Sequence, residues 1–137
     1  MKKILKIKEP DITLIERKEV NNCLKKTEIS TYGNLVENIG KNLSSYNGAK
    51  YNLPLNSGTA ALLLGFKSMG IHEEDLVITQ SFTFGATTNS IINANAKPWL
   101  FDIDELNLSI DLSKLENILK QKTFSKNGHT FLKKNKK

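Results

Sequence analysis

The 137-residue sequence predicts an α/β fold built around a parallel sheet. Three apolar segments of strand length alternate with longer segments of helical spacing, and this alternation is typical of parallel strands joined by helices. The strands are expected at 51–55, 76–79 and 97–101. Hydrophobic residues make up 39% of the chain and charged residues 25%, which is the composition of a folded globular protein and not of a disordered one.

The helices are predicted from apolar residues at three- and four-residue spacing. Between 16 and 26, Val20, Cys23 and Leu24 form such a stripe, and this helix is expected to pack by that face. Gly70 is expected to end a later helix, because glycine readily adopts the left-handed conformation that closes one. The other predicted helices begin at Asn34 or cover 59–69, 84–94 and 111–120.

The segment 51–55 is predicted to be the first strand of the sheet, at its edge. Pro54 lacks an amide hydrogen and cannot donate to a strand ladder, which an edge position tolerates. Three parts of the chain are therefore expected. They are an amino-terminal helical segment over 1–50, the beginning of the sheet domain over 51–123, and a polar, lysine-rich tail over 124–137.

Charge and cysteine content argue against several classes of protein. The net charge is +6, but the last fourteen residues contain five lysines and no acidic residue, so the basic character belongs to the tail. The single cysteine cannot form an internal disulfide, as is usual in a reducing compartment. Lys6, Lys8 and Glu9 interrupt the apolar start of the chain, so no secretory leader or membrane span is recognised. We expect a cytoplasmic protein that binds neither nucleic acid nor membrane.

The segment 56–62 carries the most specific signal, because it lies between a predicted strand and a predicted helix. Gly58 allows close approach of an anion to the backbone, and Thr59 supplies a hydroxyl group. The unpaired amides and the dipole at a helix amino terminus attract negative charge. The segment therefore predicts a phosphate-binding turn. The alternative interpretation is an ordinary helix cap made by Ser57.

The segments that follow make this turn part of a longer pattern. In chain order the pattern consists of Ser57-Gly58-Thr59-Ala60-Ala61-Leu62, Gly70-Ile71, Asp75-Leu76-Val77-Ile78, Thr83-Phe84-Gly85-Ala86-Thr87-Thr88-Asn89, and Pro98 followed by Asp102-Ile103-Asp104. It resembles the DegT/DnrJ/StrS sugar aminotransferases, which are pyridoxal-phosphate (PLP) enzymes of fold type I. The similarity begins near Pro10, and 123–130 is similar to an insertion in the branch that makes bacillosamine- and legionaminic-acid-type amino sugars.

The resemblance implies the aspartate aminotransferase-like fold, a three-layer α/β/α arrangement, with 51–123 as the first part of its large, PLP-binding domain. It also implies PLP as cofactor, a sugar nucleotide and glutamate as substrates, and a homodimer. In this family the Schiff-base lysine and the aspartate that pairs with the pyridinium nitrogen lie beyond the position of residue 137. The chain is therefore expected to be a truncated amino-terminal fragment without catalytic residues of its own.

The resemblance assigns cofactor binding to Ser57, Gly58, Thr59, Ala60 and Phe84. The first four form the turn that holds the phosphate, and the Phe84 ring stacks on the pyridine ring. Ligands of open parallel sheets bind beyond the carboxyl ends of the strands, so both segments are expected to face one pocket. The alternative for Phe84 is core packing between a helix and the sheet.

Two further groups of residues are weaker candidates. Thr31, Tyr32 and Gly33 match a family segment near the substrate entrance and the dimer interface, although a Tyr-Gly pair before a helix is also an ordinary turn. Asp102 and Asp104 follow a strand, as metal-binding or acid-base carboxylates do. No histidine or third acid with ligand spacing accompanies them, so no metal site is predicted.

Two functions remain open from the sequence. The chain is expected to be a truncated PLP-dependent aminotransferase of sugar-nucleotide biosynthesis that is inactive alone. The alternative is a non-catalytic module that binds a phosphate or nucleotide at the Thr59 helix end, or one half of a split enzyme.

Overall fold

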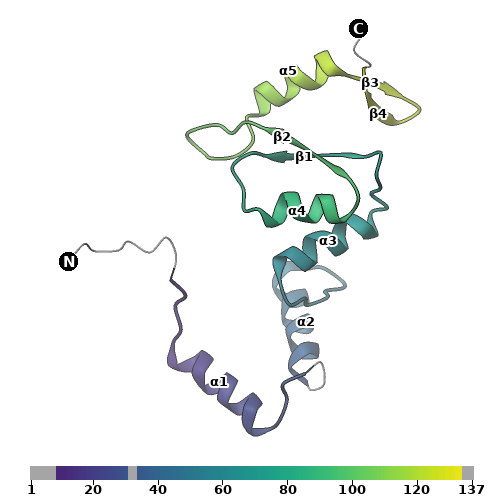
Figure 1. Cartoon of the computed structure of the whole chain (residues 1–137). Coiled ribbons are helices and arrows are strands. Elements are labelled where there is room, and N and C mark those ends of the chain that lie inside the picture. The colour runs from purple at the N-terminus through teal and green to yellow at the C-terminus, as the bar shows by residue number, and fades with distance from the viewer. Residues whose placement is uncertain (1–8, 31–33, 134–137) are drawn as a thin grey trace, which may run out of the picture. The chain divides into compact units, whose positions relative to one another are not determined.

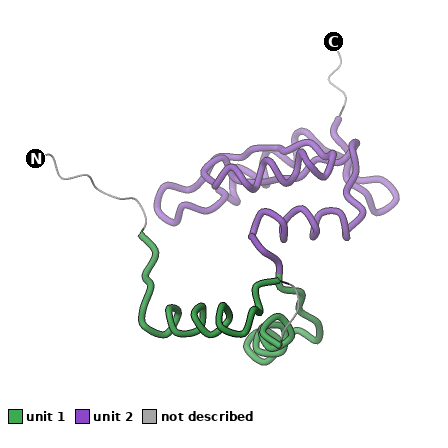
Figure 2. The backbone as a smooth tube through the Cα atoms, turned by 60° about the horizontal axis from the view of Figure 1, so that its bottom comes forward, with its two compact units in different colours: residues 1–54 green, residues 55–137 purple. Residues whose placement is uncertain are grey.

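The computed structural model describes residues 9–30 and 34–133. The chain divides into two compact units, residues 1–54 and 55–137, which Figure 2 distinguishes by colour.

The first unit contains helices α1 (Leu14–Lys25) and α2 (Asn34–Asn47), labelled in Figure 1. Thr13 caps α1, because its hydroxyl accepts a hydrogen bond from the amide of Ile15 at 3.1 Å. The Glu16 carboxylate accepts a hydrogen bond from the amide of Thr13 at 2.7 Å and completes a capping box. Both helices predicted for this region are confirmed, and the cap explains why α1 begins earlier than its apolar stripe.

The apolar stripe of α1 does not pack as predicted. Val20 is 59% exposed and Leu24 is 57% exposed. None of the described residues of the first unit is buried. Burial of a stripe requires a second layer, and the described part of this unit offers α1 none. The expectation of a packed helix is therefore wrong for this unit.

The predicted strand at 51–55 is also wrong, because these residues adopt no regular structure. A strand needs a neighbour to satisfy its backbone groups, and no described segment pairs with this one, while Pro54 removes one donor. Side chains hold the segment against α2 instead. Asn52 Nδ2 donates to Ser44 Oγ at 2.7 Å, and Asn47 Nδ2 donates to Asn52 Oδ1 at 2.9 Å.

The second unit contains a parallel strand–helix–strand arrangement. Strands β1 and β2 pair in parallel, from Leu76 opposite Lys97 to Gln80 opposite Phe101, and α4 connects them. Figure 1 shows these two strands side by side. The elements of this unit are α3 (Gly58–Ser68), β1 (Leu76–Gln80), α4 (Ala86–Asn93), β2 (Lys97–Phe101), α5 (Leu112–Lys122), β3 (Thr123–Lys126) and β4 (His129–Leu132). The α/β class and the strands at 76–79 and 97–101 are confirmed, but among the described residues the parallel sheet has two strands and not three.

The core of the second unit is small and is centred on α4. Ile91 and Ser90 of α4 are fully buried, and Phe101 of β2 and Thr79 of β1 are buried beside the helix. Trp99 packs on Phe101 with ring centroids 4.9 Å apart. Helix α4 contacts both α3 and the sheet, so it fixes the first turn of α3 relative to the strands.

A β-hairpin follows α5 where a polar tail was expected over 124–137. Strands β3 and β4 are antiparallel and are joined by Asn127 and Gly128, whose φ angles of 53° and 77° are those of a type I′ turn. The rings of Phe124 and Phe131 stack across the hairpin at 5.6 Å. The Asn-Gly pair between two short β-forming segments is the sequence signal that predicts such a hairpin.

Candidate functional site

An open hollow of about 700 Å³ lies between α3 and the turn that precedes α4. Gly58, Thr59 and Phe84 line it, so the structure brings together two segments that the sequence assigned to one pocket. The hollow is otherwise mostly apolar. Its other described lining residues are Ala61, Leu62, Gly65, Phe66, Met69, Ala86 and Thr87.

The amino terminus of α3 leaves two backbone donors free at the rim of this hollow. Ser57 caps the helix, because its hydroxyl accepts a hydrogen bond from the amide of Ala60 at 3.2 Å. Within the described parts of the chain, no group accepts from the amides of Gly58 and Thr59 or from the Thr59 hydroxyl. Ser57 and Ala60 therefore hold the turn in shape, while Gly58 and Thr59 present donors and the positive end of the helix dipole.

Phe84 does not belong to the core. Its side chain is 83% exposed, so the alternative of core packing between helix and sheet is wrong. The turn that carries it is nevertheless well held. The amide of Thr87 donates to the Phe84 carbonyl at 3.0 Å, and the hydroxyls of Thr83 and Thr87 lie 2.9 Å apart. The ring is thus presented to the hollow from a fixed backbone.

Ser90 links the two sides of the hollow and was not singled out from the sequence. It is fully buried, and its hydroxyl donates to the Thr59 carbonyl at 3.2 Å. A buried hydroxyl without a partner costs free energy, so this bond fixes α3 on α4. No local signal distinguishes Ser90 from the polar residues Thr87, Thr88 and Asn89 that precede it in the same helix.

The residues of the hollow fit part of a PLP molecule. Free amides and a hydroxyl at a helix amino terminus suit its phosphate, and an exposed aromatic ring suits one face of its pyridine ring. None of the described lining residues is lysine, aspartate or glutamate. The hollow therefore supplies neither a covalent attachment point nor a carboxylate partner for the ring nitrogen.

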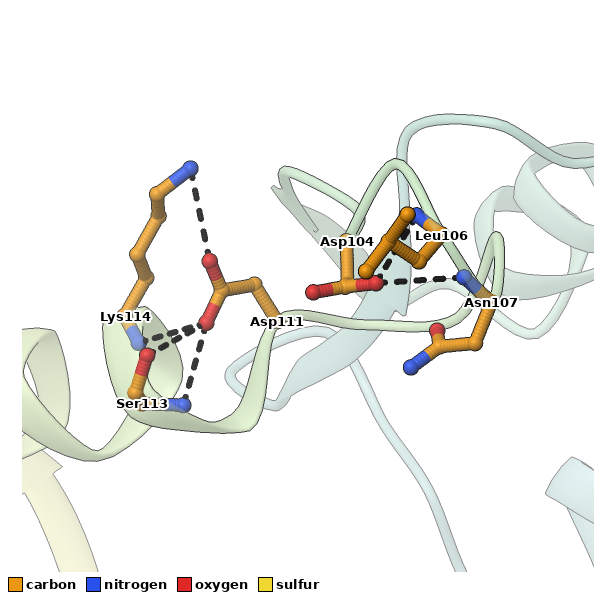
Figure 3. Close-up of polar contacts among 6 residues, drawn as sticks. All are labelled: Asp104, Leu106, Asn107, Asp111, Ser113 and Lys114. Carbon is orange, nitrogen blue, oxygen red and sulfur yellow. Dashed lines mark hydrogen bonds and ion pairs between the residues drawn. The ribbon is translucent and has the colours of Figure 1, made fainter.

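The Asp104 carboxylate and the Asp102 backbone stabilise the loop after β2. In Figure 3, Asp104 Oδ1 accepts hydrogen bonds from the amides of Leu106 at 2.9 Å and Asn107 at 3.1 Å. The carbonyl of Asp102 accepts from the amide of Asp111 at 3.1 Å. Among the described residues, no group of three histidine, cysteine or acidic side chains can hold a metal ion.

Asp111 caps α5, and its titration gives a testable prediction. Hydrogen bonds from the Ser113 hydroxyl and from the Lys114 amide lower the pKa of Asp111 from 3.8 to about 2. A lowered pKa in the folded state means that the carboxylate stabilises α5 fully above pH 3.8 and loses this effect as the pH falls through about 2.

We expect hydrogen exchange at the Ser113 and Lys114 amides to accelerate over that acidic range, beyond the intrinsic pH effect. Asp111→Asn should remove most of this added pH dependence, because the amide does not ionise. NMR titration of the carboxyl group provides a direct check. A midpoint at or above 3.8 would contradict the capping account.

Thr31, Tyr32 and Gly33, the candidates for the substrate entrance, lie outside the described residues.

The fold is that of PLP-dependent aminotransferases. A protein of Streptococcus pneumoniae described as a sugar aminotransferase, solved in PLP and PMP forms, matches this chain with a TM-score of 0.67 and 31% identity. The match covers 79% of this chain and 27% of that protein. The fold is therefore a partial fold type I, as predicted. Residues 10–127 match the DegT/DnrJ/EryC1/StrS aminotransferase family, and the chain belongs to this family.

Two relatives have names that refer to polysaccharide or amino-sugar synthesis. The spore coat polysaccharide biosynthesis protein SpsC of Bacillus subtilis is 41% identical over 108 residues, which cover 79% of this chain and 28% of the relative. GDP-perosamine synthase of Caulobacter vibrioides is 36% identical over 108 residues, covering 79% of this chain and 29% of the relative. The chain thus spans less than a third of either relative. No helix in the described residues is long and apolar enough to cross a membrane.

Proposed function

We propose that this chain forms the phosphate-binding and ring-stacking part of a PLP site in a sugar-nucleotide aminotransferase. The whole enzyme transfers an amino group from glutamate to a 4-keto sugar nucleotide. The observation that carries the proposal is that the free amides of Gly58 and Thr59 and the exposed ring of Phe84 line one hollow. Membership in the aminotransferase family supports it.

Each residue has a distinct role in this proposal. The amides of Gly58 and Thr59 and the Thr59 hydroxyl bind the phosphate at the positive end of α3. Ser57 and Ala60 hold that turn through their hydrogen bond. Phe84 covers one face of the ring and excludes water from it. When bound, PLP supplies the carbon centre that accepts and releases the amino group.

The groups that move protons in the reaction must come from outside the hollow, because its described lining contains no lysine or carboxylate. We propose that residues beyond the 137 of this chain supply them, and that the whole enzyme is a cytoplasmic homodimer. Thr31, Tyr32 and Gly33 are proposed to lie near its sugar-nucleotide entrance.

A second candidate function follows from the same lack of lysine and carboxylate in the described lining. A hollow that presents free amides without a described lysine or acid also suits a module that binds a phosphate or nucleotide without catalysis, or one half of a split enzyme. Addition of a complementary chain separates these possibilities. A truncated or split aminotransferase gains amination activity from it, and a binding module gains none.

The proposed site predicts weak binding by the chain alone. A helix-end anion site contributes only about 1 to 2 kcal/mol without its other partners, which implies a dissociation constant for PLP in the millimolar range or weaker. Equilibrium dialysis measures it. Thr59→Val should weaken binding further, because it removes the hydroxyl donor but keeps the branched shape.

Thr130→Val is the matched control, because Thr130 is an exposed residue of β4 that does not line the hollow. This variant should bind PLP as the original chain does. If the chain binds PLP with a micromolar dissociation constant and Thr59→Val abolishes this binding, the pocket is far more complete than proposed.

A further inference from the structure

The sequence contains two Asn-Gly pairs, Asn47-Gly48 and Asn127-Gly128. In such a pair the backbone nitrogen of glycine can attack the side-chain carbonyl carbon of asparagine, since glycine has no side chain that hinders the approach. From the sequence alone the two pairs are equivalent. The structure places them in different surroundings.

Hydrogen bonds engage the reacting groups of the first pair. Asn47 Oδ1 accepts from the amide of Ala49 at 2.9 Å, and Asn47 Nδ2 donates to Asn52 Oδ1 at 2.9 Å. The amide of Gly48 donates to the Ser44 carbonyl at 3.0 Å as part of the last turn of α2. Both the attacking nitrogen and the carbon under attack are therefore held in place.

The second pair forms the exposed tip of the hairpin. The strand ladder ends at Lys126 opposite His129, so Asn127 and Gly128 lie outside it. Within the described chain, neither the Asn127 side chain nor the Gly128 amide has a hydrogen-bond partner. The two strands have four residues each, and a hairpin of this size opens readily. The reacting groups can thus reach each other during local opening.

We propose that Asn127 is a site of spontaneous deamidation and that Asn47 is protected from it. The Gly128 nitrogen forms a bond with Asn127 Cγ, the Cγ–Nδ2 bond breaks, and ammonia leaves with the proton of the Gly128 amide. Water then opens the resulting succinimide at either carbonyl. The products are aspartate and isoaspartate, and no oxidant or enzyme takes part.

The isoaspartate product is incompatible with the turn described here. Its main chain contains one additional carbon, whereas the type I′ turn requires two residues with positive φ, as at Asn127 and Gly128. The hairpin end is also tied to α5, because Lys133 Nζ donates to the carbonyls of Lys120 at 3.0 Å and Gln121 at 2.8 Å. Modification is therefore expected to open the hairpin and to release this contact.

The test is to incubate the full chain in mildly alkaline native buffer and to quantify both Asn-Gly peptides over time by mass spectrometry. Asn127 should deamidate several-fold faster than Asn47. In concentrated urea the two rates should converge, because the protecting bonds of Asn47 are lost. Equal rates in native buffer, or faster loss at Asn47, would overturn the proposal.

Asn52→Ala provides a matched variant, because it removes the acceptor for Asn47 Nδ2 and leaves the hairpin sequence unchanged. The rate at Asn47 should rise several-fold, and the rate at Asn127 should not change. If the rate at Asn47 does not rise, the hydrogen bonds of Asn47 are not its protection, and the structural basis of the proposal is wrong.

Discussion

The 137-residue chain alone is expected to give no glutamate-dependent amination of a 4-keto sugar nucleotide above a protein-free background. The hollow around Gly58, Thr59 and Phe84 has no described lysine to hold PLP and move protons, and no described acid to pair with the ring nitrogen. Free PLP in solution lacks both the lysine that moves protons and the acid that pairs with its ring nitrogen.

The assay uses the chain with glutamate, PLP and the keto sugar nucleotide, and product is quantified by mass spectrometry. A full-length member of the family, assayed in parallel, serves as the positive control. Amination by the chain above background would mean that a catalytic group lies within these 137 residues.

The second large effect that we expect is a low stability of the isolated chain. Only four hydrophobic residues are buried in the described chain, namely Ile91, Ala94, Ala96 and Phe101. The parallel sheet has two strands within residues 9–30 and 34–133, and Leu100 of the sheet and Phe82 beside it are exposed. Apolar burial offsets the loss of chain entropy on folding. So little burial predicts marginal stability, and open strand edges predict association.

We expect the purified chain to aggregate, or to bind a hydrophobic dye and unfold without a sharp thermal transition. The relatives contain a further part that this chain does not span. Co-expression of the chain with a segment that corresponds to this part should make the chain soluble. Calorimetry and light scattering measure both effects. A monodisperse monomer that unfolds cooperatively without any partner would favour the binding-module alternative.

The elements predicted correctly from the sequence are those fixed by local interactions. Ser57 before Gly58 marks the start of α3, and the segments 76–79 and 97–101 are apolar runs bounded by turn residues. A cap or a turn depends on residues a few positions apart, so the sequence contains the whole signal. The free amides at Gly58 and Thr59 were also predicted correctly, because they follow from the position of the helix start.

The errors concern interactions between distant segments. Residues 51–55 are mostly apolar and of strand length, but they find no partner strand among the described residues. Val20 and Leu24 have the spacing of a packed stripe, yet nothing described in their unit covers them. Whether a segment finds its partner depends on the rest of the fold, which no local pattern encodes. The hairpin at 123–132 was missed for a different reason, because its Asn-Gly signal was read as part of a polar tail.

The proposal that Gly58 and Thr59 hold one end of a divided PLP site is tested most directly by retention of PLP through gel filtration. The samples are the chain alone, the chain co-expressed with the complementary segment, and that complex carrying Thr59→Val or the control Thr130→Val. We predict that the chain alone retains no PLP, that the complex and the Thr130→Val complex retain it, and that the Thr59→Val complex loses most of it. Retention by the chain alone, or equal retention in the Thr59→Val complex, would contradict the proposal.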